Sequence, residues 1–332
     1  MRIKDVKVTI NLVKPIGHVG FGCPLILEEN ATEAIAYAEY TDLVSVGEAG
    51  YEVTSKVYKT AQLMFMQAHA PEKIAICSAS EGATTWLAKQ ENISKDWRQL
   101  VVLSGGGDAA TDVAGIMAAI EAEATYPKLY FANVDFDDAT EYTVEGIDRT
   151  LLCYYTPTED IPSPVAAIAG EVGGLSIGSY TINNLVLSGV TPLDLSETEV
   201  DAIHKKGGVT IVLSAGDCVV TEGKAAGGSY IDDTDNNDWI KYQLEYKTQK
   251  LLNNSLKIPY TNAGIAMLES VAMEVMTDAK NKNIVDNFTV TYLKREEVAA
   301  EDRTARRYIG GKVVYEMAGA IHTVEINCEC HL

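Results

Sequence analysis

The sequence has little positive charge. It contains 27 lysines and arginines against 47 aspartates and glutamates, which gives a formal net charge of -20 at pH 7. Proteins that hold nucleic acid by neutralising phosphates carry a basic footprint instead. The charge therefore argues against direct binding of nucleic acid, and for the same reason against attraction to an anionic membrane surface.

Long apolar runs are also missing. No stretch approaches the roughly 20 apolar residues that a membrane-spanning helix needs, so we expect no membrane insertion. The charged residues Asp5 and Lys7 interrupt the start of the chain, which is not typical of a signal peptide. We therefore expect synthesis in the cytoplasm with reduced thiols. The six cysteines are Cys23, Cys77, Cys153, Cys218, Cys328 and Cys330.

Motifs for catalysis are scarce. The chain has only 5 histidines, and none lies in a nucleophile elbow or a zinc-protease helix. A phosphate-binding loop of the GxxxxGK[ST] type is absent from the sequence as well. These absences predict a structural or interaction protein that is not an enzyme.

The residues that are present predict an α/β fold, α+β overall, with a mainly parallel sheet. With 332 residues, of which 47% are hydrophobic, the chain is long enough for about two domains. Short, continuously apolar strands at Gln99–Leu103, Lys128–Val134 and Arg149–Tyr155 are separated by helix-like segments such as Ala109–Ala124. Such strands are typical of a parallel sheet that is covered on both faces.

Further elements follow from hydrophobic periodicity. In the first half, the patterns predict helices over 32–40 and 55–69 and a strand over 73–77. In the second half, they predict a hairpin over 209–213 and 217–221, helices over 237–252 and 262–280, and strands over 288–293 and 313–317.

Both ends of the chain read as strands. Apolar residues alternate with polar ones at Val6, Val8 and Ile10, and again at Val324, Ile326 and Cys328. An unpaired terminal strand exposes a row of unmet backbone hydrogen-bonding groups. We therefore expect each of these strands to pair with another subunit.

One glycine-rich turn leaves an enzymatic alternative open. Gly105, Gly107 and Ala110 fit the G-x-G-x-x-G/A pattern between a strand and a helix, and Asp135 follows near the end of the next strand. Such a loop can hold the pyrophosphate of NAD. The alternative function is therefore an NAD-type oxidoreductase that uses the Gly105–Gly107 loop, although a simple tight turn explains the glycines equally well.

Two metal-like patterns are weaker. The acidic run 233–238 begins like a calcium loop but lacks the required glycine and glutamate, and carboxylates at the start of a helix explain it better. The residues His322, Cys328, Cys330 and His331 are zinc-ligand types without zinc-site spacing. We expect neither a metal nor a cofactor.

The second half of the sequence resembles the contractile tail sheath proteins of bacteriophages. The resemblance rests on four runs: V-V-T-E-G-K-A-A-G-G-S-Y-I-D at 219–232, D-W-I at 238–240, K-I-P-Y-T-N-A-G-I at 257–265 and A-G-A-I-H-T-V-E-I-N at 318–327. The residues Trp97 and Arg149-Thr150-Leu151 resemble the family more loosely. Prophage-derived and phage-tail-like particles are included in this resemblance.

The resemblance implies a homo-oligomer of stacked rings, expected to be hexameric, around an inner tail tube. Shortening of the sheath drives the tube through a bacterial envelope. The implied partners are the tube protein and the baseplate and tail terminator proteins, and the implied location is the virion tail, after synthesis in the bacterial host cytoplasm. No catalysis and no cofactor are implied. The chain departs from many sheath subunits in being too short for a protruding domain.

The resemblance also orders the chain. It implies an N-terminal arm (1–22), an outer α/β domain (23–205), an inner tube-facing domain (206–320) and a C-terminal arm (321–332). Residues 241–332 contain 12 basic and 12 acidic residues, so the excess negative charge lies in residues 1–240. We expect Lys280, Lys282, Lys294 and Arg295 to face the tube. We also expect Gly17, Gly20 and Gly22 to act as a hinge, because glycine tolerates wide backbone rotation.

Overall fold

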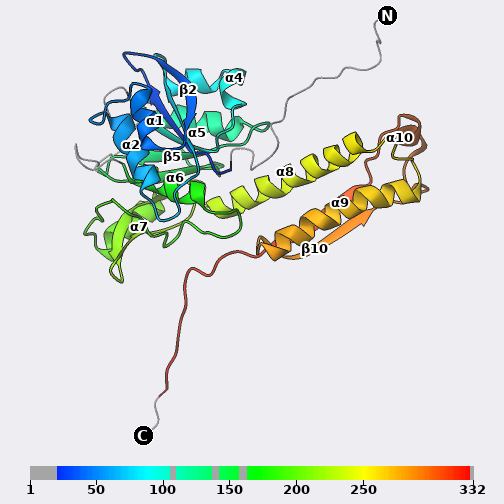
Figure 1. Cartoon of the computed structure of the whole chain (residues 1–332). Helices are drawn as coiled ribbons and strands as arrows, with labels where there is room; N and C mark the ends of the chain where they lie inside the picture. The colour runs from blue at the N-terminus through cyan, green and yellow to red at the C-terminus, as the bar shows by residue number, and fades with distance from the viewer. Residues whose placement is uncertain (1–20, 105–109, 137–141, 157–162, 330–332) are drawn as a thin grey trace, which may run out of the picture.

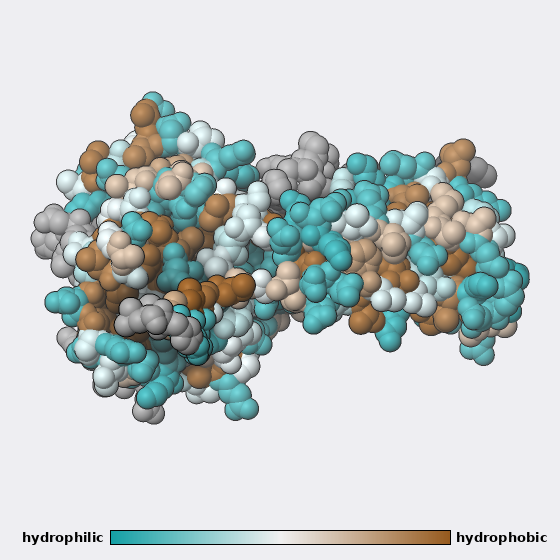
Figure 2. Space-filling view, turned by 90° about the horizontal axis from the view of Figure 1, so that it is seen from below, coloured by the Kyte–Doolittle hydropathy of each residue, from teal (hydrophilic) through white to brown (hydrophobic). Residues whose placement is uncertain are grey.

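A computed structural model describes residues 21–104, 110–136, 142–156 and 163–329. The chain forms a compact α/β part, here called the body, from which a long pair of helices and a hairpin project (Figure 1). The projecting part, residues 231–317, is here called the distal unit. Seen from below, it extends well beyond the body (Figure 2).

A seven-stranded sheet forms the centre of the body. Its strand order is β2-β3-β1-β4-β5-β6-β7, and every neighbouring pair is parallel except β2 and β3. The prediction of a mainly parallel α/β sheet is therefore confirmed. The strands are β1 (Leu25–Glu29), β2 (Ile35–Tyr40), β3 (Ile74–Ser78), β4 (Gln99–Ser104), β5 (Leu129–Val134), β6 (Thr150–Tyr154) and β7 (Gly208–Val209).

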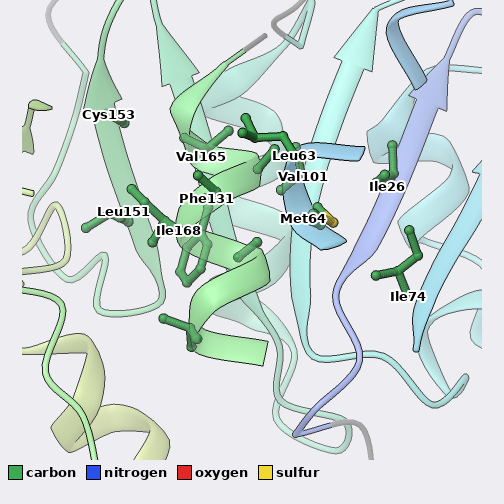
Figure 3. Packing of buried hydrophobic residues seen from close by; sticks show 14 of the residues in the cluster. Ile26, Leu63, Met64, Ile74, Val101, Phe131, Leu151, Cys153, Val165 and Ile168 are labelled. Atoms are coloured by element: carbon green, nitrogen blue, oxygen red, sulfur yellow. The ribbon is translucent and has the colours of Figure 1, made fainter. Parts of the chain in front are cut away.

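Helices cover both faces of this sheet because its central strands are apolar on both faces. Along each strand, alternate side chains enter opposite cores: Ile26 packs on one side, and Leu25 and Leu27 pack on the other. Helices α1 (Leu43–Glu48), α2 (Lys56–Phe65) and α6 (Pro164–Gly174) contribute to the first core, which Figure 3 shows. Helices α3 (Ala83–Leu87), α4 (Gln90–Ile93), α5 (Val113–Ala122) and α7 (Glu197–Lys205) contribute to the second.

Helix α6 is the central helix of the first core. Its residues from Pro164 to Gly173 are all buried. A Cβ atom at Gly170 would lie 2.6 Å from the backbone of Met64 in α2. Glycine at this position therefore lets the two helices approach until their backbones touch.

The expected helix over 32–40 is wrong. Residues Ile35–Tyr40 form β2, the antiparallel edge strand beside β3. The Ile-Ala-Tyr-Ala-Glu-Tyr sequence mixes strand-favouring Ile and Tyr with helix-favouring Ala and Glu, so pairing with β3 and partial burial decide the structure. The other elements that were expected in the body lie within a few residues of their expected positions, with α5 beginning at Val113 instead of Ala109, whereas the helices α1, α3, α4 and α6 were not expected.

The distal unit is built on two long antiparallel helices and one hairpin. Helices α8 (Ile231–Asn254) and α9 (Asn262–Asn281) pack against the strands β10 (Val285–Tyr292) and β11 (Gly311–Met317). Trp239, Ile240 and Met276 form its core together with Phe21 and Ile177 of the body. The 24 residues of α8 make it about 36 Å long. The remaining elements are α10 (Ala300–Thr304) and the small hairpin β8 (Ile211–Ser214) and β9 (Asp217–Val220).

The expected domain limits stay predictions. The body's sheet continues through β7 at residues 208–209, beyond the expected limit at residue 205, and the distal unit begins with α8 at residue 231. The expected N-terminal arm strand lies in residues 1–20, outside the described part of the chain.

Candidate assembly site

The hairpin of the distal unit has two outer edges to which no other strand of the described residues is hydrogen-bonded. Within the described residues, β10 and β11 pair with each other and with no third strand. One face of the hairpin, including Phe288, Val290 and Tyr315, packs against the helices. The outer edges of β10 and β11 therefore present backbone donors and acceptors to a strand from elsewhere.

The C-terminal segment continues from the hairpin with exposed apolar side chains. Residues 318–329 form no helix or strand in the single chain. Val324 and Ile326 are 70% and 78% exposed, and Cys328 is also exposed. Their expected counterparts Val6, Val8 and Ile10 lie outside the described residues. The pairing of either segment with another subunit therefore stays a prediction.

The four basic residues expected to face the tube do not form one cluster. Lys280 lies in the last turn of α9 and Lys282 caps the same helix end, whereas Lys294 and Arg295 follow β10. The backbone N–H of Arg295 donates to Asn262 Oδ1 at the start of α9, over a distance of 2.8 Å. Because α9 has 20 residues, the two pairs lie about 30 Å apart, one near the body and one at the far end.

The expected glycine hinge is described only at its last residue. Gly17 and Gly20 lie outside the described part of the chain, and Gly22 lies in a turn before β1. A Cβ atom at Gly22 would lie 3.2 Å from the carbonyl oxygen of Gly173. Gly22 therefore sits close against the end of α6, and its role as a hinge stays a prediction.

A buried group of charges joins the distal unit to the body. Arg98, at the start of β4, is 2% exposed and pairs with Asp235 and Asp238 of α8 at 2.5 and 2.6 Å. Arg149, just before β6, holds both oxygens of Asp238 at 2.6 and 3.0 Å. Tyr180 donates its hydroxyl to the remaining oxygen of Asp235 at 2.5 Å. These five residues are here called the junction network.

The junction network satisfies its own charges. Burial raises the pKa of the Asp238 carboxyl, but the hydrogen bonds and positive charges of Arg149 and Arg98 outweigh burial and lower it overall. Burial lowers the pKa of Arg98, and the two carboxylates reverse that effect. Arg98 also donates to the carbonyl oxygen of Pro127 at 2.6 Å. The base of α8 is therefore held by several charge-assisted bonds, which are stronger than neutral ones.

Sequence reasoning missed this network. The acidic run 233–238 predicts favourable charges at a helix start, but in the structure Asp235 and Asp238 are buried partners of two arginines. The partners lie far away in the sequence, so no local pattern reveals them. The only available signal was the resemblance of both Arg149 and the 238–240 run to one family.

The NAD-type loop finds no support in its surroundings. Gly105 and Gly107 lie outside the described residues, but α5 starts only at Val113 and is capped by the carboxylate of Asp112. The buried carboxylate of Glu29, at the end of β1, accepts bonds from the backbone N–H groups of Ala83 and Thr111. A negative charge thus occupies the edge of the sheet where a pyrophosphate would bind.

No metal site is visible in the described ranges, where no three histidine, cysteine or acidic side chains come together around a common point. Of the zinc-like residues, Cys330 and His331 lie outside those ranges. Likewise, no helix among the described residues is both long enough and apolar enough to cross a membrane.

Comparison with solved structures identifies the fold. A chain of the anti-feeding prophage (AFP) baseplate matches with a TM-score of 0.74 at 13% identity, covering 94% of each chain. A chain of the PVC sheath complex in its contracted state, from an extracellular contractile injection system, matches with 0.70 at 13% identity, covering 92% of this chain and 91% of that one. The sheath tail protein of Desulfitobacterium hafniense matches with 0.59 at 10% identity, covering 84% and 92%. No protein-family model and no curated protein matches the sequence. The chain therefore has the fold of the sheath proteins of contractile systems.

Proposed function

We propose that the chain is the structural subunit of a contractile sheath. Such subunits polymerise helically around an inner tube, and the polymer shortens to drive the tube through a bacterial envelope. The observation that carries this proposal is the likeness to a contracted PVC sheath chain over 92% of this chain, which includes both the body and the distal unit. The role is mechanical and requires neither catalysis nor a cofactor.

The open hairpin and the exposed C-terminal segment support assembly into a homo-oligomer. A strand from a neighbouring subunit can add to an open sheet edge, and Val324 and Ile326 would bury their apolar side chains in that pairing. Each backbone hydrogen bond gained contributes roughly 1 kcal/mol net. We infer stacked, hexameric rings linked by the terminal segments, with Val6, Val8 and Ile10 as the strand of the other end.

The other partners are part of the same proposal. The inner tube protein would lie against the distal unit, with Lys280 and Lys282 at one end of α9 and Lys294 and Arg295 at the other. The baseplate and tail terminator proteins would bind the two ends of the polymer. The subunit would be made in the bacterial host cytoplasm and reside in a phage tail or a phage-tail-like particle.

We further propose that contraction moves the body and the base of α8 as one rigid piece. The junction network supports this because separating the two would leave buried charges without partners. Conformational change would then concentrate in the terminal segments, with the glycines at 17–22 as the hinge.

Electron microscopy tests the proposal. The purified chain, alone and together with an inner tube protein, is imaged by negative staining over increasing concentrations, and NAD is titrated into the same preparation by calorimetry. We expect rings or tubes and no saturable heat from NAD. A small oligomer that never polymerises and binds NAD saturably would reject the sheath role in favour of the oxidoreductase alternative.

A further inference from the structure

A cavity of about 230 Å³ lies where the base of the distal unit meets the body. Its walls come from four segments that are distant in the sequence: the loop 178–181 after α6, the first turns of α8, the turn after α9 and the chain just after β11. The lining residues Asn283, Gly319 and Ala320 are exposed, so the cavity opens to solvent on their side. An ion from solution can therefore enter it.

The wall that α8 contributes holds an unpartnered carboxylate oxygen. Asp232, in the first turn of α8, is 7% exposed, and its Oδ1 atom is buried without a hydrogen-bond partner. Asn236 lies one helical turn further on, on the same face of α8, and is 9% exposed. Asp233 also lines the cavity and is half-buried. A buried oxygen without a partner is costly, and in native proteins such oxygens are typically satisfied by ordered water or an ion.

The negative charge of this wall is not balanced by its surroundings. Burial and the charge of Asp233 raise the pKa of the Asp232 carboxyl, and the hydrogen bonds from Thr181 and from the backbone at the start of α8 do not outweigh them. The favourable field at the start of a helix therefore does not account for this carboxylate. The main groups that act on Asp232 include no cation, and the charge of His322 acts on Asp233 instead.

We propose that this cavity is a binding site for a divalent metal ion, calcium or magnesium, held by Asp232, Asp233 and the side-chain oxygen of Asn236. Carboxylate, amide and carbonyl oxygens are the ligands that these hard cations take. The described residues contain no cluster of three histidine, cysteine or acidic side chains, so the two carboxylates here would be supplemented by amide and backbone oxygens and by water. The cavity has room for several waters beside the ion, since each takes about 30 Å³ in the liquid.

A bound ion would join the body to the distal unit at a second place. The loop 178–181 already contacts α8 through Tyr180, whose hydroxyl donates to Asp235 in the junction network. An ion on the neighbouring turn of α8 would add a link that exists only in the folded chain, and it would therefore stabilise that chain. The site belongs to the single subunit and does not rest on the proposed function. A failure to form sheaths and a failure to bind the ion are thus separate results.

The test is a calorimetric titration of the isolated, chelator-treated subunit with CaCl2 and, separately, with MgCl2. A background of about 0.15 M NaCl screens the weak attraction of cations to the acidic surface. We expect saturable binding of a single ion for at least one of the two salts, and the tighter of the two identifies the ion. Asp232→Asn and Asp233→Asn should each weaken this binding at least about tenfold. The control Asp201→Asn removes the same charge at an exposed position of α7 and should leave the affinity unchanged.

Thermal unfolding provides a second readout, with opposite signs in two conditions. In chelator, Asp232→Asn should melt at a higher temperature than the wild type, because it removes a buried charge and its repulsion from Asp233. In excess of the cation, the wild type should melt higher than it does in chelator, whereas the variant should not respond. A merely structural carboxylate would lower the melting temperature in both conditions when replaced. That result, the absence of saturable binding for both salts, or unchanged affinity in both cavity variants would overturn the proposal.

Discussion

Arg98 and Asp235 lie 137 residues apart in the sequence and form an ion pair of 2.5 Å in the interior of the protein. This pair joins the central sheet of the body to the base of α8. Asp238 adds a second carboxylate to the same guanidinium and is shared with Arg149. The orientation of the distal unit therefore depends on a set of charges that cannot be separated without a large penalty.

Removing Arg98 should destabilise the whole subunit. Arg98→Met leaves Asp235 buried with only the Tyr180 hydroxyl as its partner, and loss of one member of a buried pair costs about 3–5 kcal/mol. Denaturant unfolding measures this loss. The matched control is Lys89→Met, which removes the half-exposed pair with Glu81 and should cost less than about 1 kcal/mol. Equal effects of the two substitutions would show that the junction network does not hold the fold.

Lys128 should make stability depend on pH above neutrality. Burial and the charge of Arg98 lower its pKa to about 7, although its Nζ donates to the carbonyl oxygens of Lys95 and Trp97. The unfolded chain holds this proton up to about pH 10.4, so between pH 7 and that value the unfolded state binds more protons and stability rises with pH.

The measurement compares the free energy of unfolding of the wild type with that of Lys128→Met at pH 7.0 and 8.5. Because the two proteins share every other titrating group, the difference between them reports on Lys128. The difference in unfolding free energy, wild type minus variant, should increase by about 1 kcal/mol per pH unit. Below pH 6 it should be flat. A difference that stays constant from pH 6 to 8.5 would mean that Lys128 is charged throughout this range.

Deleting either terminal segment should abolish long polymers without unfolding the subunit. Residues 323–329 are exposed, so their removal takes little from the core. We expect chains lacking residues 1–13 or 323–332 to remain monodisperse, to keep the wild-type melting temperature and to form no tubes by negative staining. In the full chain, cysteines at Thr9 and Glu325 should form crosslinks between subunits. Contractile tubes from both truncated chains, or crosslinks within single chains only, would rule out the strand mesh.

The two basic pairs on the distal unit should contribute separately to tube binding. Reversing the charges of Lys280 and Lys282 together, or of Lys294 and Arg295 together, should each weaken co-assembly with the tube, and both effects should shrink at high salt. Lys205→Glu, at an exposed position on the body, serves as the control. Co-sedimentation over a salt series provides the measurement. If neither reversal changes the salt dependence, the tube binds another face.

The parts of the fold that could be predicted are those set by local patterns. The apolar runs at β4, β5 and β6 indicate buried parallel strands, and the spacing of Ile265, Ala272 and Val275 indicates the buried face of α9. The edge strand β2 could not be predicted from its own residues, because its structure is decided by pairing with β3. The partner of Tyr40 is Ile74, the first residue of β3, which lies 34 residues further along the chain.

The assembly site was predictable only in the parts that a local sequence pattern reveals. Alternation at Val324 and Ile326 indicates an extended segment, and the structure leaves both of these side chains exposed. The separation of Lys280 from Lys294 was not predictable from their nearness in sequence, because α9 and β10 run in opposite directions.

The length of α8 has a mechanical consequence. A rigid rod of about 36 Å, fixed at its base by the junction network, acts as a lever. A rotation of the body by roughly 10° would carry the far end of that lever through about 6 Å, more than the spacing between neighbouring strands of a sheet. In the proposed sheath, small changes in how neighbouring bodies pack would thereby be magnified at the tip, where a shift of this size is enough to exchange one set of contacts for the next.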